Sequence, residues 1–215
     1  IFNTPSLFKS ATDSYSSSKI KFIIKITSRI STPLSQLISA DISDEASVVA
    51  LLSDKRLSVW SLATSQLQNE WPISYFPENQ YYISLSKNKR VIASAGKKHI
   101  TIIELNSGKT IAKWKVKGFS EYAQISMIKF SDNGMQLFIG LNEGSIIWVN
   151  FAANKRSLFK VHDGAVKFLE YSQNGNFLLS GGLDGAINTL NLVNANIEQI
   201  AVASSRVTCL TMNEQ

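Results

Sequence analysis

The sequence predicts an all-β protein built from four-stranded antiparallel units that repeat along the chain. Short strands of one kind begin at residues 57, 100, 146 and 187, so their starts lie 43, 46 and 41 residues apart. These strands and their neighbours are rich in β-branched and aromatic residues, which favour extended backbone. No window of the sequence carries a sustained helical period of apolar residues. The repeat is therefore the feature that organises the fold.

Each repeat contains four apolar runs, and each run is expected to form one strand. The runs are continuous rather than alternating, which indicates strands buried on both faces. The expected first strands are Leu37–Ile42, Tyr81–Leu85, Ile125–Phe130 and Val166–Tyr171. The second strands are Val48–Leu52, Val91–Ala95, Leu137–Leu141 and Phe177–Ser180. The third are Leu57–Leu62, Ile100–Leu105, Ile146–Phe151 and Ile187–Leu192, and the fourth include Leu67–Ile73 and Ile111–Val116.

Glycine-containing turns separate the strands of the third and fourth repeats. Asn133-Gly134 and Asn174-Gly175 fall between first and second strands, and Asn-Gly favours tight hairpins because both residues accept a positive φ. Glu143-Gly144 and Asp184-Gly185 fall between second and third strands. The turns therefore predict antiparallel pairing within each repeat.

Four-stranded units repeating every 40 to 45 residues describe the blades of a β-propeller. One such sheet cannot bury both faces alone, so the blades must pack against one another. The expected blades span about residues 34–73, 80–117, 124–161 and 164–203, within a propeller region that covers residues 19–215. We expect a leader or linker at 1–18, an outer strand of an earlier blade at Lys19–Ile26, and the start of a further blade at 206–215.

The fourth unit resembles the WD-repeat β-propeller family. Val161-His162 stands at the Gly-His pair of that family, Ser180–Gly185 at the turn that enters the third strand, and Leu190-Asn191 at the Trp-Asp pair. The corresponding pairs of the other units are Trp60-Ser61, Ile103-Glu104 and Val149-Asn150. The cadence of the second to fourth units also resembles the WD-repeat lipoproteins of Gram-negative bacteria.

This resemblance implies a bacterial cell-envelope protein whose lipid anchor lies outside this chain, with a cytoplasmic protein as the alternative. Closed propellers of the family have seven or more blades, which need roughly 300 residues. We therefore expect a partial propeller whose missing blades come from the rest of the chain or from self-association. A closed ring of four blades is the alternative. The family also braces its blades with a hydrogen-bond chain, for which the resemblance supplies His162, Ser180 and Asp184, while Leu190 stands at the Trp position.

The composition argues against catalysis and against metal binding. The chain has one cysteine, Cys209, and two histidines, His99 and His162, which leaves no disulfide framework and no cysteine-rich zinc site. It contains no nucleophile-elbow, zinc-protease or phosphate-loop motif. We expect no enzyme activity, no catalytic residue, no cofactor and no metal. A propeller enzyme, such as a glycosidase using loop acids or a quinoprotein, is the alternative.

The second unit is strongly basic, with nine Lys and Arg residues but only one acid, Glu104, between Lys87 and Lys117. Alternation along its fourth strand places lysines on the face opposite Trp114. Such lysines protect an edge strand, or they bind an anionic surface such as lipid headgroups or a polyanion. Nucleic acid is disfavoured, because base stacking needs aromatic residues on the lysine face. The lysines concerned are Lys109, Lys113, Lys115 and Lys117.

Loops that join fourth to first strands and second to third strands meet on one rim of a propeller. Aromatic residues and lysines on such loops suit protein binding, unless the aromatic rings are tucked beneath the loops. The favoured function is a non-catalytic scaffold that binds an unidentified protein partner, and the alternative is an electrostatic binder of anionic surfaces. The predicted partner-binding residues are Tyr75, Phe76, Lys97, Lys98, Phe119 and Tyr122.

Overall fold

The protein is an all-β chain with four antiparallel sheets of four strands each, as predicted. The computed structural model describes residues 8–10, 21–23, 36–43, 47–87, 91–172, 174–203, 205 and 207. Within these ranges the helical structure is one short 3-10 turn, η1 (Ile73–Tyr75). That turn is too short to cross a bilayer, and the described residues contain no longer apolar helix.

The strand order in every sheet follows the chain, so each sheet is a simple meander. The strands expected from the apolar runs are all present, with small differences at their ends. The first sheet contains β3 (Leu37–Ser43), β4 (Val48–Ser53), β5 (Arg56–Ser61) and β6 (Leu67–Pro72). The second contains β7 (Tyr82–Leu85), β8 (Val91–Ala95), β9 (His99–Glu104) and β10 (Thr110–Lys115). The third contains β11 (Ile125–Phe130), β12 (Gln136–Leu141), β13 (Ser145–Asn150) and β14 (Lys155–Lys160). The fourth contains β15 (Val166–Tyr171), β16 (Phe177–Gly182), β17 (Ala186–Asn191) and β18 (Ile197–Val202).

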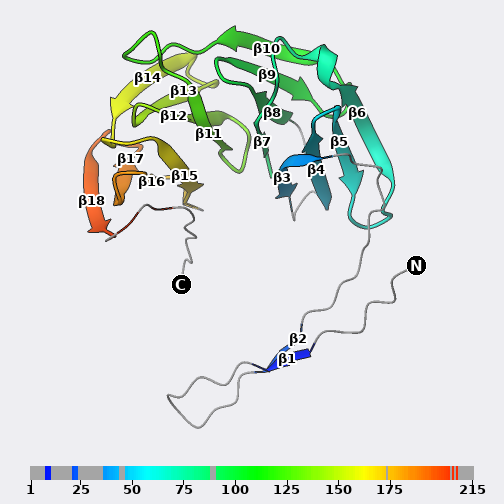
Figure 1. Ribbon diagram of the computed structural model, residues 1–215, viewed down its shortest axis with the longest axis horizontal. Helices are drawn as coiled ribbons and strands as arrows, with labels where there is room; N and C mark the ends of the chain where they lie inside the picture. Colours follow the sequence, from blue (N-terminus) through cyan, green and yellow to red (C-terminus); the bar gives the residue numbers. More distant parts are fainter. Residues whose placement is uncertain are drawn as a thin grey trace.

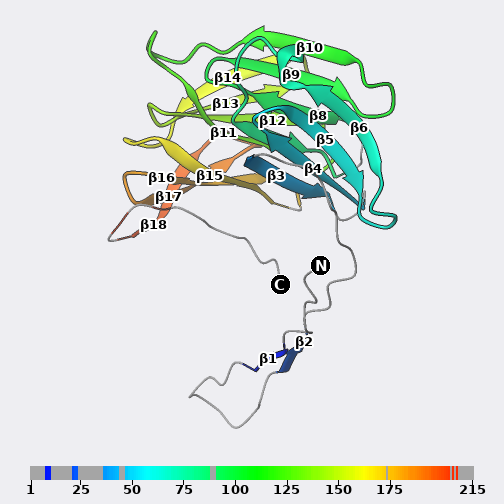
Figure 2. The ribbon, with the colours of Figure 1, turned by 45° about the vertical axis from the view of Figure 1, so that its right-hand side comes forward.

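The four sheets fan out in chain order around a common inner side (Figure 1). The first strands β3, β7, β11 and β15 line that inner side, and β3–β7, β7–β11 and β11–β15 contact one another directly. The fourth strands β6, β10, β14 and β18 lie on the outside of the fan, and the turned view shows the sheets layered one on another (Figure 2).

Apolar side chains fill the space between each pair of neighbouring sheets. Val59 and Ile103 belong to the cluster between the first and second sheets, and Ile102 and Ile139 to that between the second and third. Phe138 and Leu190 belong to the third cluster, between the third and fourth sheets. The middle sheets are covered on both faces, which explains why their strands are continuous apolar runs.

Equivalent side chains on the inner strands link each sheet to the next. The amide of Leu85 donates to Asp41 Oδ2 at 2.6 Å, and the amide of Phe130 donates to Ser84 Oγ at 3.0 Å. Lys129 Nζ pairs with Glu170 Oε2 at 3.1 Å. Asp41, Ser84, Lys129 and Glu170 each oppose the same position of the second strand in their own sheets. One position of the repeat therefore holds the inner strands together.

The predicted Asn-Gly turns are present, but in each of them only the glycine, and not the asparagine, has a positive φ, and each also contains a serine that was not predicted to matter. Gly134 and Gly175 have φ of +69° and +75°. Ser131 Oγ accepts from the amide of Gln136 at 3.0 Å, and Ser172 Oγ accepts from Phe177 at 2.9 Å. A buried serine thus fixes each hairpin.

The strand near the N-terminus differs from its expected role. β1 (Phe8–Ser10) and β2 (Lys21–Ile23) form a two-stranded antiparallel sheet, which lies apart from the four larger sheets in both ribbon views (Figures 1 and 2). Lys19–Ile26 was expected to be an outer strand of an earlier blade, but its described strand pairs locally instead. The segment 206–215, expected to begin a further blade, lies outside the described residues except for Val207.

Candidate protein-binding rim

The loop 116–124, which joins β10 to β11, is fastened to the turn between β8 and β9. The amide of Val116 donates to the carbonyl of Lys98, and the amide of Ile125 donates to that of Lys97, both at 2.7 Å. Lys98 Nζ also donates to the carbonyl of Glu121 at 2.9 Å. The structure therefore places Lys97 and Lys98 beside the loop that carries Phe119 and Tyr122. We call these four residues the rim patch.

The two aromatic residues of the rim patch project into solvent rather than under the loop. Phe119 is 64% exposed and Tyr122 is 76% exposed. Gly118 lets the loop pass close to the third sheet, because a Cβ there would lie 2.6 Å from that of Ala123 and 2.7 Å from Leu141. Exposed aromatic side chains held on a constrained loop are suited to contacting another protein.

Glu143 fixes this loop from the turn between β12 and β13. Its Oε1 accepts from the amide of Phe119 at 2.7 Å, and its Oε2 accepts from that of Ser120 at 3.0 Å. Ser145 Oγ donates to the same carboxylate, and Lys160 Nζ donates to the backbone carbonyl of Glu143. The sequence pattern indicated only that Glu143 is an acid in a turn, and this role in holding the loop was not predicted.

The fourth sheet repeats the arrangement, whereas the second sheet inverts it. Asp184 Oδ2, in the turn between β16 and β17, accepts from the amide of Asp163 in the loop that enters the sheet. In the second sheet the acid lies in the entering loop, where Glu78 Oε1 accepts from the amides of Lys98 at 2.7 Å and His99 at 2.8 Å. Burial alone would raise the pKa of Glu78, but these donors outweigh burial and lower it. A carboxylate thus joins loop to turn in three consecutive sheets.

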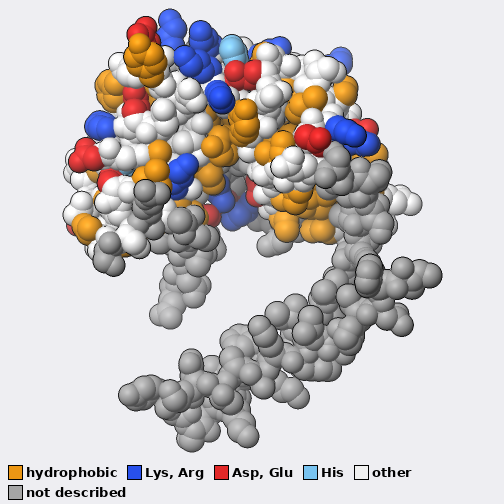
Figure 3. Space-filling model, in the orientation of Figure 1, with side chains coloured by type: hydrophobic (Ala, Val, Ile, Leu, Met, Phe, Trp, Pro, Cys, Tyr) orange, Lys and Arg blue, Asp and Glu red, His pale blue; other side chains and the backbone are white. Residues whose placement is uncertain are grey.

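A pocket of about 370 Å³ opens at the rim patch, where it is lined by the end of β10, the turn between β8 and β9, and the loop 116–124. Lys98, Lys115 and Lys117 line it together with Phe119, and Glu121 is its acidic member. Lysine and arginine side chains gather at the top of the molecule, where β10 lies in the matching ribbon view (Figure 3). The surface around the rim patch is therefore basic as well as aromatic.

Tyr75 and Phe76 do not join the rim patch. Phe76 is only 6% exposed and belongs to the core cluster between the first and second sheets, so its ring is not available to contact a partner. Tyr75 is partly exposed, but its hydroxyl lies 2.7 Å from Thr110 Oγ1 at the start of β10. Both side chains therefore contact the second sheet, Phe76 in its core cluster and Tyr75 at the start of β10.

The lysines of β10 and its extension face solvent, as the alternation predicted. Lys113, Lys115 and Lys117 are exposed, and Trp114 is half-buried between them. The guanidinium of Arg156 on β14 lies 4.8 Å from the centroid of the Trp114 ring. Lys109 is exposed at the other end of β10, in the turn from β9, and is therefore remote from Lys117 along the strand.

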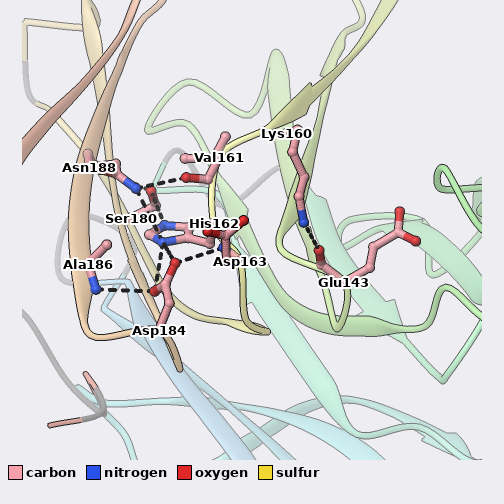
Figure 4. A network of polar contacts seen from close by, with 9 residues as sticks. All are labelled: Glu143, Lys160, Val161, His162, Asp163, Ser180, Asp184, Ala186 and Asn188. Carbon is pink, nitrogen blue, oxygen red and sulfur yellow. Dashed lines mark hydrogen bonds and ion pairs between the residues drawn. The ribbon is translucent and has the colours of Figure 1, made fainter.

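His162, Ser180 and Asp184 are brought together at the entrance to the fourth sheet (Figure 4). His162 Nε2 lies 2.8 Å from Ser180 Oγ, and its Nδ1 lies 3.2 Å from Asp184 Oδ1. Asn188 completes the cluster, because its Nδ2 donates to the carbonyl of Val161 at 2.8 Å. The order Ser–His–Asp is that of a catalytic triad, but Ser180 is fully buried and beyond the reach of a substrate.

Burial controls the charge of this cluster. Burial lowers the pKa of His162 below its ordinary value, even though the carboxylate of Asp184 opposes that shift. Burial alone would raise the pKa of Asp184, but the amides of Asp163 and Ala186 donate to it, and its pKa lies below the ordinary value. The folded protein therefore favours a neutral imidazole beside an ionised carboxylate. Within the described ranges, no three His, Cys, Asp or Glu residues gather closely enough to hold a metal ion.

Comparison with known proteins shows a similarity to a protein of cilia and flagella. The chain is 31% identical over 160 residues to "Cilia- and flagella-associated protein 57 C" of Tetrahymena thermophila. The match covers 69% of this chain but only 12% of the relative, so this chain corresponds to a small part of that protein. No family model matches the chain.

This similarity corrects the expected relationship. The relative is a eukaryotic protein associated with cilia and flagella, so the expected kinship with bacterial WD-repeat lipoproteins is wrong. The bacterial origin and the lipid anchor were expected only because of that kinship, so neither expectation is kept. The spacing of the strands suggested the bacterial kinship. Strand spacing reflects sheet geometry, which proteins of different origin share, so it does not identify a relative.

Proposed function

We propose that the four sheets are consecutive blades of a β-propeller and that a further sheet covers the outward face of the first. Ile42, Leu85 and Phe130 occupy the same position in the first, second and third sheets, each opposite the same position of the second strand. Leu85 and Phe130 are 7% and 2% exposed, because the preceding sheet covers them, whereas Ile42 is 57% exposed. A longer chain or a second copy would supply the covering sheet.

The function that the geometry supports best is that of a non-catalytic scaffold which binds a protein partner through the rim patch. The observation that carries it is the pair of highly exposed aromatic residues on a loop fixed by Glu143. Lys97 and Lys98 beside them would attract acidic groups of the partner and speed its association. The name of the relative associates that protein with cilia and flagella, so the partner is sought among ciliary proteins.

Site-specific photocrosslinking tests this function. A photoreactive phenylalanine analogue at position 119 or 122 is expected to crosslink one defined partner in ciliated cells. Position 193 is the matched control, because Val193 is 78% exposed but lies in the turn between β17 and β18. In a pull-down without a photoreactive residue, the double variant Phe119→Ala with Tyr122→Ala should no longer retain that partner, whereas Val193→Ala should still retain it. Equal crosslinking from positions 119 and 193 would reject the rim patch.

The lysines of the second sheet support the alternative, an electrostatic binder of anionic surfaces. Lys109, Lys113, Lys115 and Lys117 are all exposed and belong to one edge of the sheet. Such binding would fall steeply as salt rises and would depend on all four lysines alike. Binding through the rim patch would depend mainly on Phe119 and Tyr122, so the two functions are separable by these variants.

A further inference from the structure

We propose that the seam between β10 and β14 is a groove that binds an extended, acidic segment of a protein partner. The proposal deepens the scaffold function and rests on it, because it assigns the chemistry of the partner. The groove is a hollow of about 380 Å³ between the outer strands of the second and third sheets. It is continuous with the pocket at the rim patch, since Lys115 and Lys117 line both.

The groove has an apolar floor and basic walls. Trp114, Ile147 and Leu158 form the floor, and all three pack on or within the core cluster between the second and third sheets. Lys115, Lys117 and Arg156 line the walls, and the described residues that line this groove include no Asp or Glu. An occupant must therefore offer negative charge to the walls and apolar groups to the floor.

Arg156 is held in position by the floor itself. Its guanidinium lies 4.8 Å from the centroid of the Trp114 ring, which leaves the edge of the planar guanidinium able to donate to a carboxylate. A flat arginine fixed on an aromatic face loses less conformational freedom on binding than a free lysine does. This contact makes Arg156 the anchor of the groove.

The spacing of the lysines favours an extended occupant. Lys115 is the last residue of β10 and Lys117 follows two residues later, and like-facing side chains on an extended backbone repeat about every 6.6 Å. Acidic side chains at alternate positions of an extended peptide repeat at the same distance, and the residues between them point the other way, toward the floor. A segment in which acidic and apolar residues alternate therefore matches both the walls and the floor.

Other polyanions match the groove less well. A lipid headgroup or a phosphate backbone would satisfy the lysines but would leave the apolar floor exposed. Base stacking on Trp114 is obstructed because Arg156 already covers that ring. Charge and shape together thus select an acidic protein segment.

Fluorescence anisotropy with a labelled synthetic peptide tests the proposal on the full 215-residue chain. The probe is a peptide of about ten residues in which Glu alternates with Val, a length that suits an extended segment across the seam. We expect salt-sensitive binding, and we expect Lys115→Ala with Lys117→Ala to weaken it by about tenfold or more. The same peptide with Gln in place of Glu should bind about tenfold more weakly.

Matched controls make the result specific to the groove. Lys109→Ala with Lys113→Ala removes the same charge but no residue that lines the groove, and it should change the affinity by about twofold at most. Arg156→Ala should weaken binding more than Lys155→Ala, its exposed neighbour outside the groove. Thermal unfolding of each variant verifies that the fold is intact.

Two outcomes would overturn the groove. One is an equal loss of affinity from the two double-lysine variants, together with binding to phosphatidylserine vesicles, which would indicate a diffuse anionic surface. The other is undiminished binding of the Gln peptide. Crosslinking from positions 119 and 122 and the anisotropy of the peptide are separate readouts, so failure of the rim patch and failure of the groove remain distinguishable.

Discussion

Glu143 shows how one side chain can determine the placement of a whole loop. Its two carboxylate oxygens accept from consecutive amides, so the loop before β11 is held at two adjacent points. Hydrogen bonds to an ionised acceptor are stronger than neutral ones. Phe119 is consequently presented at a fixed place even though its ring lies in solvent.

Replacement of Glu143 by Ala should loosen this loop without unfolding the sheets. We expect a loss of about 1–3 kcal/mol in the free energy of unfolding, because two backbone amides lose a charged partner. Hydrogen–deuterium exchange should accelerate at Phe119 and Ser120. Glu121→Ala is the control, since it removes the same charge from the loop itself, and unchanged exchange in Glu143→Ala would contradict the assigned role.

The buried imidazole of His162 should make stability depend on pH. Its pKa in the folded protein lies below the ordinary value of 6.5, because burial disfavours the charged form. The unfolded chain therefore binds a proton more readily, and stability is full above pH 6.5 but falls as the pH drops from 6.5 toward the folded pKa. Urea titrations at pH 7.5 and pH 5 measure this loss.

His162→Gln provides the comparison for that titration. The variant should be less stable at pH 7.5, because the bonds to Ser180 and Asp184 are altered. Its stability should change less between pH 7.5 and pH 5 than that of the native chain, since glutamine does not titrate. An identical pH dependence in both proteins would assign the effect to other groups.

At the scale of elements, the turns between second and third strands decide how closely the sheets approach. Gly144 has a φ of +86°, and a Cβ on it would lie 2.6 Å from the carbonyl carbon of His162 and 2.8 Å from the carbonyl oxygen of Gly164. The turn of the third sheet therefore rests on the loop that enters the fourth. Only glycine fits this contact.

Alanine substitution of two glycines that both have a positive φ, Gly144 and Gly108, tests that contact. Gly144→Ala should cost about 2–4 kcal/mol of unfolding free energy, because it adds both a left-handed residue and a clash with backbone. Gly108 has a φ of +69°, but a Cβ there would meet only Trp71 at 3.9 Å. Gly108→Ala should therefore cost only about 1–2 kcal/mol. Equal costs in thermal denaturation would show that the approach of the turn to the loop is not limiting.

At the scale of the molecule, the open faces of the fan should control association. Ile42 and Leu85 are equivalent in position but opposite in exposure. Ile42→Lys should change the free energy of unfolding by less than about 0.5 kcal/mol and should weaken self-association of the chain in sedimentation velocity experiments. Leu85→Lys should cost more than about 3 kcal/mol, because it places an amine in the core. Similar costs for both variants would indicate that the first sheet is already covered.

Much of the fold was predictable from the residues because each strand and turn of a repeat has a recognisable local sequence pattern. The apolar runs located the first, second and third strands of all four sheets and the fourth strands of the first two, and Asn133-Gly134 and Asn174-Gly175 located two hairpins. The serine that precedes each of those turns, Ser131 or Ser172, recurs with the repeat and could also have been recognised.

The rim was only partly predictable, because exposure depends on packing between sheets. Lys97, Lys98, Phe119 and Tyr122 do meet at the rim. Phe76 looked equivalent to Phe119 in the sequence, but it is buried where the loop crosses the seam between two sheets. The hydrogen bond from Phe119 to Glu143 joins residues 24 positions apart, and no local sequence pattern predicts a contact between residues so far apart.

The sequence alone determined the all-β class, the number of units and the alternation of lysines along β10, because these depend on local periodicity and turn chemistry. The tertiary structure alone decided which aromatic side chains are exposed, which carboxylates hold the loops, and that Arg156 meets Trp114 across a seam. The physical reason is how far apart along the chain the contacting residues lie. Strand formation follows from neighbours along the chain, whereas a surface is made of residues that the stacking of separate sheets brings together.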